Sequence, residues 1–183
     1  MLRRSIFIAC ASLSAAFTAA AHCTASSTAP GDVVHEGLLD PSVSVERRQR
    51  LADRLLCSAV AGHAASQELA GTLYLQGRSR RGNILPRDIP RARRLLTAAA
   101  DRGRRHAMRA LAELELADGH AHEAALWSRV EQELYGGSRV ASSEGHAGPV
   151  GKAAGRDARL DAEVNLKVQA IREALAPASP SGD

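Results

Sequence analysis

Apolar residues recur at helical spacing along most of the chain after residue 44. Steps of three and four residues between leucines, valines and alanines predict helices over about 44–61, 65–77, 88–103, 105–117 and 120–135. The same spacing predicts a last amphipathic helix over 157–176, on an apolar series made of Leu160, Val164, Val168, Ile171 and Leu175. The pattern therefore predicts an all-α protein.

Residues at the predicted helix ends support these segments. Asp88 is a suitable N-cap because its carboxylate accepts hydrogen bonds from the free N–H groups of the first helical turn, and Pro90 lies in that turn, where no hydrogen bond is lost. Gly103 ends the same helix, and Gly77 and Gly119 end two others. The helices between 65 and 135 thus form two consecutive pairs joined by turns.

Three stretches lack periodic apolar residues. We expect a flexible linker over 22–43, a disordered Gly-rich connection over 136–156 and a tail over 177–183. The helices over 44–135 then form one domain, because 183 residues leave room for a single domain of ordinary size. Aromatic residues make up only 3% of the chain, so Leu, Ala, Val and Ile must build the core.

The N-terminus has the pattern of a secretory signal peptide. Arg3 and Arg4 precede an apolar stretch over 6–17, and small residues lead up to a cleavage site after Ala21. The stretch is shorter than the roughly 20 residues that span a bilayer, which favours cleavage over a retained anchor. The arginine pair lacks most of the twin-arginine pattern, which favours the general secretory route. We therefore expect a signal peptide over 1–21 and a periplasmic or secreted bacterial protein without a transmembrane segment.

Cleavage would leave two cysteines, Cys23 and Cys57, in an oxidising compartment. A disulfide between them would tie the linker to the first helix and, from loop closure, contribute about 3 kcal/mol. A buried Cys57 and a free Cys23 fit the sequence equally well. Cys23 also raises the alternative of a lipoprotein, although His22 before it departs from the usual pattern.

The two helix pairs resemble a known repeat. Short pairs that cannot bury their apolar faces alone and lean on one another define an α-solenoid. The first pair resembles the Sel-one-like repeat, a relative of the tetratricopeptide repeat, at Gly71, Tyr74, Gly77, Leu85-Pro86-Arg87-Asp88, Ala92, Leu95, Leu96, Ala99-Ala100 and Gly103. The resemblance implies that the small residues let two helices approach closely, while the large ones fill the space between neighbouring pairs.

The second pair carries the resemblance only at Leu116, Gly119, Ala124 and Trp127. The likeness covers about 65–135, and the linker of the first copy is longer than usual. It implies a short α-solenoid of antiparallel pairs in which the helices over 44–61 and 157–176 act as end caps. The alternative is an unrelated Ala-rich helical bundle.

Charge is unevenly distributed along the chain. Residues 78–109 carry eleven arginines against two acids, whereas the chain from Glu113 onward carries twelve acids and seven bases. The candidate binding residues for an anionic partner are those near the start of the third helix: Arg78, Arg80, Arg81, Arg87, Arg91 and Arg94. Cations near a helix N-terminus are unfavourable, which a docked anion would offset. Solvated arginines in an Arg-rich composition are the alternative.

No catalytic motif stands out. The chain lacks the nucleophile-elbow, phosphate-loop and dinucleotide glycine patterns, and His120 and His122, two residues apart, point to different sides of a helix. We expect no enzyme activity, no metal or cofactor and, without interleaved aromatics, no nucleic-acid partner. The leading hypothesis is an exported adaptor that binds a protein or peptide, acidic in character. An envelope enzyme or inhibitor with an unrecognised site, and a subunit of an obligate envelope complex, remain alternatives.

Overall fold

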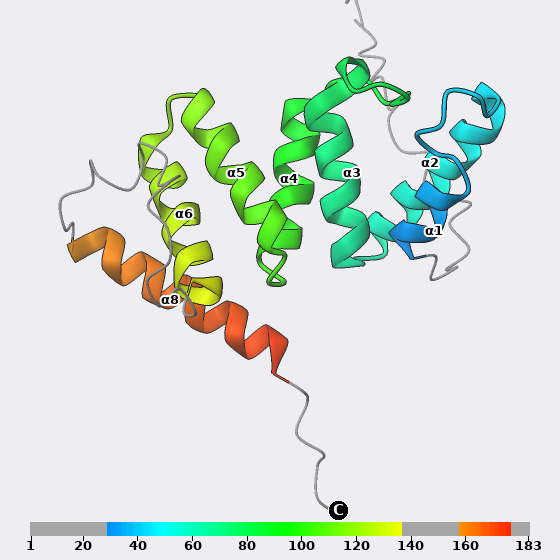
Figure 1. The fold of residues 1–183 in the computed structure, drawn as a ribbon. Coiled ribbons are helices and arrows are strands. Elements are labelled where there is room, and N and C mark those ends of the chain that lie inside the picture. Colours follow the sequence, from blue (N-terminus) through cyan, green and yellow to red (C-terminus); the bar gives the residue numbers. More distant parts are fainter. Residues whose placement is uncertain (1–28, 137–157, 177–183) are drawn as a thin grey trace, which may run out of the picture.

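The computed structural model describes residues 29–136 and 158–176, and within these ranges the chain is helical with no β-strand (Figure 1). The elements in chain order are α1 (Pro30–His35), α2 (Val45–Val60), α3 (Ala64–Gln76), the 3-10 helix η1 (Gly77–Ser79), α4 (Ile89–Ala100), α5 (Arg105–Ala117), α6 (Ala121–Tyr135) and α8 (Ala158–Leu175). The predicted all-α class is confirmed. None of the helices in these ranges is long and apolar enough to cross a membrane.

Capping residues explain where two of the helices begin. Ser44 precedes α2 and its hydroxyl accepts from the N–H of Arg47 at 3.3 Å, while the carboxylate of Asp88 accepts from the N–H of Arg91 at 2.9 Å. Each cap satisfies one N–H of a first turn that has no partner within the helix. The N-cap predicted at Asp88 is therefore confirmed.

The linker predicted over 22–43 is wrong in its second half. Pro30 begins the six-residue helix α1, and Val33 and Leu38 are each only 1% exposed. The turn after α1 is closed by a hydrogen bond from the N–H of Leu38 to the carbonyl of Val33, with Gly37 at φ +101°. A helix this short shows no 3.6-residue periodicity, and its apolar residues find partners only in the folded chain. The rest of the predicted linker, 22–28, lies outside the described residues.

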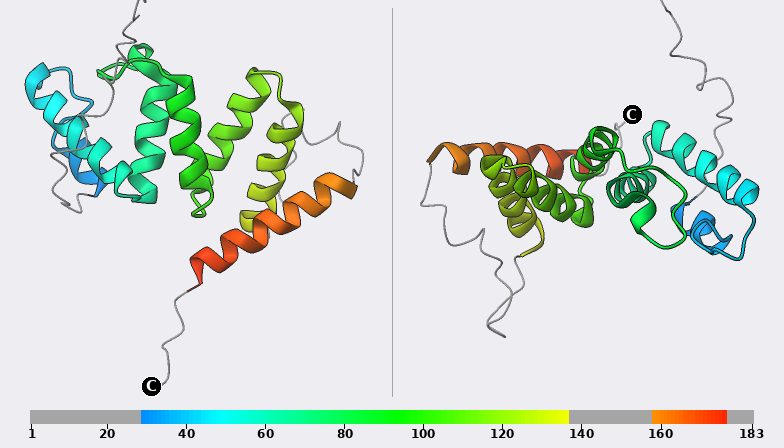
Figure 2. Two further views of the ribbon diagram at one scale, coloured as in Figure 1. Left: turned by 180° about the vertical axis from the view of Figure 1, so that it is seen from behind. Right: turned by 90° about the horizontal axis from the view of Figure 1, so that it is seen from above.

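Consecutive helices pack against each other along the chain. α2 lies beside α3, α3 beside α4, α4 beside α5 and α5 beside α6, so that they form a row (Figure 1). The view from above in Figure 2 shows α1 and α2 at one end of this row and α8 at the other. The centre of the row is α4, which contacts helices on both sides.

The segments α2–α3 and α4–α5 bury side chains at matching positions. The buried pairs, each 41 residues apart, are 51/92, 55/96, 58/99, 59/100, 66/107, 67/108, 70/111, 73/114 and 74/115. The turns match as well: the N–H of His63 donates to Ser58 O, and the N–H of Arg104 donates to Ala99 O, both at 3.1 Å. In each turn the preceding glycine has a positive φ, +93° at Gly62 and +74° at Gly103.

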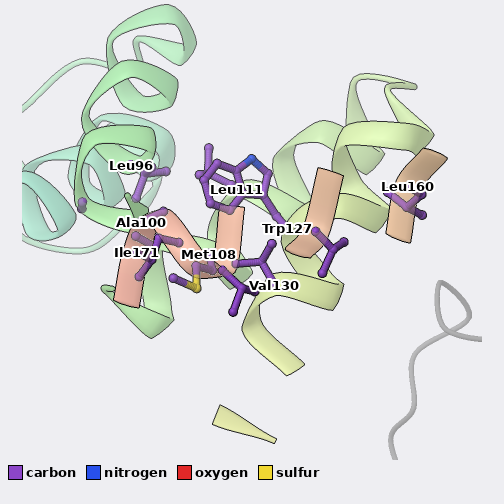
Figure 3. Packing of buried hydrophobic residues seen from close by; sticks show 12 residues of the cluster. Leu96, Ala100, Met108, Leu111, Trp127, Val130, Leu160 and Ile171 are labelled. Carbon is purple, nitrogen blue, oxygen red and sulfur yellow. The ribbon is translucent and has the colours of Figure 1, made fainter. Parts of the chain in front are cut away.

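Two clusters of buried side chains meet at α4. One joins α1, α2, α3 and the start of α4 around Leu55, Leu73 and Tyr74. The other joins the second half of α4 with α5, α6 and α8, where Met108 and Leu111 are fully buried (Figure 3). Because α4 contributes side chains to both clusters, it joins the cores of the two halves of the row.

The C-terminal helix α8 packs on this second cluster. Its apolar series is buried: Leu160, Val164, Val168 and Ile171 are each at most 5% exposed. Polar contacts surround the seam, since Lys167 Nζ lies 2.7 Å from Asp101 Oδ1 and 4.8 Å from the centre of the Trp127 ring. The fifth residue of the predicted apolar series, Leu175, stays 55% exposed near Gly103.

Several predicted segments cannot be compared with the structure. The signal peptide over 1–21, the tail over 177–183 and all of the 136–156 connection except Gly136 lie outside the described residues. Their assignments remain predictions from the sequence.

Candidate functional site

The described arginines divide into those with a carboxylate partner and those without. Carboxylates from α3, α5 and α6 neutralise four arginines of the basic stretch 78–109: Arg93, Arg104, Arg105 and Arg109. Arg93 contacts both Glu115, at 2.7 Å, and Asp118. Carboxylates from other parts of the chain therefore offset part of the positive charge that the sequence concentrates over 78–109.

The six predicted binding residues keep their positive charge exposed. We call them the arginine surface: Arg78, Arg80, Arg81, Arg87, Arg91 and Arg94, all of them exposed. Within the part of the chain that the structure describes, only Arg91 has a carboxylate within 4.0 Å, with Nε 3.9 Å from Asp88 Oδ2. Arg80 donates instead to the side-chain amide of Gln76 at 2.9 Å. Folding thus leaves this group of cations largely unneutralised.

A buried amide holds the loop that carries the arginine surface. Asn83 is 7% exposed, and its Nδ2 donates to the carbonyls of Leu73 and Gly77, each at 2.7 Å. Its Oδ1 accepts from the N–H of Leu85 at 3.1 Å. The Leu73 carbonyl also accepts from the N–H of Gly77 and the Gly77 carbonyl from the N–H of Arg80, so the Asn83 side chain adds a second donor to each and fixes the loop to the end of α3.

Two glycines allow the loop to lie close to its neighbours. A Cβ at Gly77 would approach the backbone N of Arg87 to 2.7 Å, and a Cβ at Gly82 would collide with the carbonyl of Leu39. Both glycines also have positive φ values, +55° and +80°. Arg48 of α2 braces the loop from the other side by donating to Gly82 O at 3.1 Å. These contacts hold the backbone of the loop in a fixed position.

Arg91 is positioned by an aromatic ring. Its guanidinium lies 5.0 Å from the centre of the Tyr74 ring and donates to the Tyr74 hydroxyl at 2.8 Å. Tyr74 is 2% exposed, and its carbonyl accepts from the N–H of Asp88 at 3.0 Å. Tyr74, one of the residues that carry the repeat resemblance, therefore links the end of α3 to the start of α4 and orients Arg91.

The paired carboxylates next to the arginine surface are held ionised. Burial raises the pKa of the Glu115 carboxyl, but hydrogen bonds from Arg93 and His120, with the attraction of their charges, outweigh burial and leave the pKa below its ordinary value. Burial likewise raises the pKa of Glu131, and hydrogen bonds and charges from Arg105 and Arg109 lower it further than burial raises it. At neutral pH both carboxylates are therefore ionised and paired with their arginines.

The histidines face different carboxylates. His120 Nδ1 lies 2.7 Å from Glu115 Oε2, and His122 Nε2 lies 2.7 Å from Glu163 Oε2 on α8. Among the described residues, no three His, Cys, Asp or Glu side chains gather in a way that could hold a metal ion. The two histidines therefore contribute to separate polar contacts.

Cys57 of α2 is half-buried and disulfide-bonded. Cys23, the partner expected from the sequence, lies outside the described residues, so the Cys23–Cys57 pair remains a prediction.

Sequence reasoning missed Asn83, which carries no pattern that distinguishes a buried amide from an ordinary turn residue. The six arginines were singled out from the sequence because they cluster along the chain, and their role in binding remains a prediction. The Sel-one-like assignment of 65–135 remains an interpretation of its residues. Comparison with protein-family models, with curated proteins and with solved structures finds no match to this chain.

Proposed function

We propose that this protein is an exported, non-enzymatic adaptor: a short solenoid of Sel-one-like helix pairs that docks an acidic protein partner on the arginine surface. The observation that carries the proposal is that five of the six arginines lack a carboxylate partner among the described residues, and that four of these five lie on a loop that Asn83 and two glycines hold in place. A preformed cationic platform loses little conformational entropy on binding. Charge complementarity then supplies steering and specificity.

The repeat architecture draws its support from the matched burial of α2–α3 and α4–α5. Matching buried positions and matching glycine turns are what stacked pairs require, because each pair completes the core of the next. In this arrangement the flanking helices α2 and α8 act as end caps, and α1 packs on α2. Closely packed pairs leave the loops at their ends free to carry binding residues.

The position of α8 also bears on the alternative of an obligate complex. That alternative relied on an apolar helix face in need of a partner. In the structure this face is buried within the same chain, with Ile171 at 1% exposed. The exposed cations are therefore the stronger binding feature.

A binding assay with a defined acidic probe tests the proposal. The mature protein is titrated against a fluorescein-labelled peptide of twelve glutamates, and anisotropy is recorded at low and at high salt. We expect binding that weakens with salt, because exposed ion pairs are screened. Changing Arg78, Arg80 and Arg81 to Glu should abolish it.

A matched control changes three other exposed arginines, Arg47, Arg50 and Arg172, to Glu. This variant has the same net charge as the loop variant but keeps the arginine surface. Equal loss of binding in both variants would contradict the proposal, because net charge alone would then explain the result. Export is tested separately by fractionating a bacterial host and sequencing the N-terminus of the mature chain.

A further inference from the structure

The exposed face of α4 continues the arginine surface along the whole helix. Positions 91, 94 and 98 lie on one face of α4, and Arg87, just before the N-cap Asp88, and Arg102, just after the C-cap Asp101, flank this face at its two ends. Four of the five are exposed arginines, and the fifth, Ala98, is half-buried. We call this series the α4 strip: Arg87, Arg91, Arg94, Ala98 and Arg102.

The opposite face of α4 confirms the orientation of the strip. The buried residues of this helix are Ala92, Leu96, Ala99 and Ala100. Arg93, one residue before Arg94, points toward α5 and pairs with Glu115. The helical part of the strip therefore lies on the side of α4 opposite its buried residues, with the Arg91 guanidinium over the ring of Tyr74, a member of the first cluster.

Acidic residues next to the strip are already engaged. The carboxylate of Asp88 caps α4, and Asp101 Oδ1 lies 2.7 Å from Lys167 Nζ of α8. Arg94 and Arg102 have no carboxylate partner among the residues that the structure describes. The carboxylate contact of the strip among the described residues is therefore the 3.9 Å approach of Arg91 Nε to Asp88 Oδ2.

The length of the strip argues against a compact ligand. At 1.5 Å per helical residue, the backbone from Arg87 to Arg102 extends about 22 Å. A single phosphate or carboxylate reaches only neighbouring arginines in such a line. An acidic chain in an extended conformation, at roughly 3.3 Å per residue, covers the same distance with about seven residues.

The surroundings of the strip favour an acidic protein segment over a single-stranded nucleic acid. Nucleic-acid strands bind through aromatic side chains on which bases stack, in addition to cations. The neighbouring ring, Tyr74, is 2% exposed and lies beneath Arg91, and Trp127 is 7% exposed beside Lys167. Neither ring is free to stack on a base.

We propose that the α4 strip extends the docking site and that the partner is a linear acidic protein segment lying along α4. This inference rests on the proposed function and specifies the shape of the partner. Arg102, outside the six residues predicted from sequence, becomes the far end of the site. Arg91, held by Tyr74, and Arg94 form its centre.

Binding as a function of peptide length tests the strip. Labelled peptides of four, eight and twelve glutamates are titrated against the mature protein. An exposed ion pair contributes about 0.2 to 1 kcal/mol, or about 1.4-fold to five-fold in affinity. The eight-residue peptide reaches about two more arginines than the four-residue peptide, so we expect its binding to be about ten-fold tighter, with little further gain at twelve.

Charge reversal at Arg94 and Arg102 is the matching variant. Both side chains are exposed and without ion pairs in the described structure, so R94E/R102E should keep the wild-type circular dichroism spectrum and melting temperature. We expect this variant to bind the four-residue peptide more weakly than the wild type, because Arg94 belongs to the arginine surface, and to lose the ten-fold gain at eight residues. The control R50E/R172E has the same net charge and should retain the gain.

The outcomes separate the strip from the proposed function. If the wild-type protein bound none of the peptides, the proposed function itself would be contradicted. Binding that needs Arg78, Arg80 and Arg81 but shows no gain with length, or the same gain in R94E/R102E, would overturn the strip alone. Tighter binding of an eight-residue oligothymidylate than of the eight-residue glutamate peptide would also overturn it.

Discussion

Gly71 of α3 lies against Leu96 of α4, and its replacement by alanine tests that contact. A Cβ at this position would lie 2.8 Å from Leu96 Cγ and 3.2 Å from the backbone N of Leu96, whereas ordinary contacts begin at 3.4 Å. Leu96 is fully buried, so its side chain has little room to move. Accommodating the methyl group therefore requires the two helices to separate by about half an ångström.

The magnitude follows from two opposing effects. Overpacking of this kind lowers the free energy of unfolding by about 1–3 kcal/mol. Alanine in a helix interior is favoured over glycine by about 0.5–1 kcal/mol. The net expectation for Gly71→Ala is a loss of about 1 kcal/mol, or a melting temperature lower by about 3–5 °C for a domain of this size.

Thermal and urea unfolding followed by circular dichroism at 222 nm measure this change. Gly31→Ala is the matched control, because Gly31 also lies in a helix but has nothing within 4 Å of its Cβ position. We expect Gly31→Ala to be neutral or slightly stabilising. If Gly71→Ala raised the melting temperature as well, the close α3–α4 approach and the role of Gly71 inferred from the family resemblance would be refuted.

Three further changes test other parts of the structure. Asn83→Ala should lower the free energy of unfolding by about 1–3 kcal/mol, because the buried hydrogen bonds of the Asn83 side chain to the Leu73 and Gly77 carbonyls and from the Leu85 N–H are lost, and urea titration measures it. Ile171→Ala should lower it by about 2–4 kcal/mol, and the emission of Trp127, the chain's single tryptophan, should shift toward that of exposed indole at lower urea concentration as α8 detaches. Folding lowers the pKa values of the Glu115 and Glu131 carboxyls below their ordinary value of 4.5, so the stabilisation they give is present above that pH and is lost as pH falls through the lowered pKa. E115Q/E131Q should flatten the resulting slope of the free energy of unfolding against pH, measured by urea titrations between pH 3 and 7. A slope unchanged in that variant would contradict the assignment.

The helices were predictable because their signals are local. Apolar spacing, the Asp88 N-cap and the terminating Gly103 act within a few residues, and the helix they predict over 88–103 is observed as α4. The helix predicted over 105–117 coincides with α5. The short helix α1 was not predictable, because its stability comes from burying Val33 and Leu38 against helices that follow it in the chain.

The candidate site was predictable as a cluster but not as a surface. Arg93 and Arg94 are adjacent in the sequence and equally basic. Helical phase points one toward α5 and the other toward solvent, and only the first meets Glu115. Asn83 was missed for a related reason, since its two acceptors belong to the end of a helix that precedes it by several residues.

The sequence by itself therefore determined the helix-forming segments, their ends and the excess of positive charge near residue 80, because each depends on neighbours along the chain. The tertiary structure decided which cations stay uncompensated, because neutralisation depends on acids brought from other helices through space. Glu68, Glu115 and Glu131 neutralise arginines that are distant in sequence. What they leave is a group of exposed guanidinium groups on the loop before α4 and along that helix.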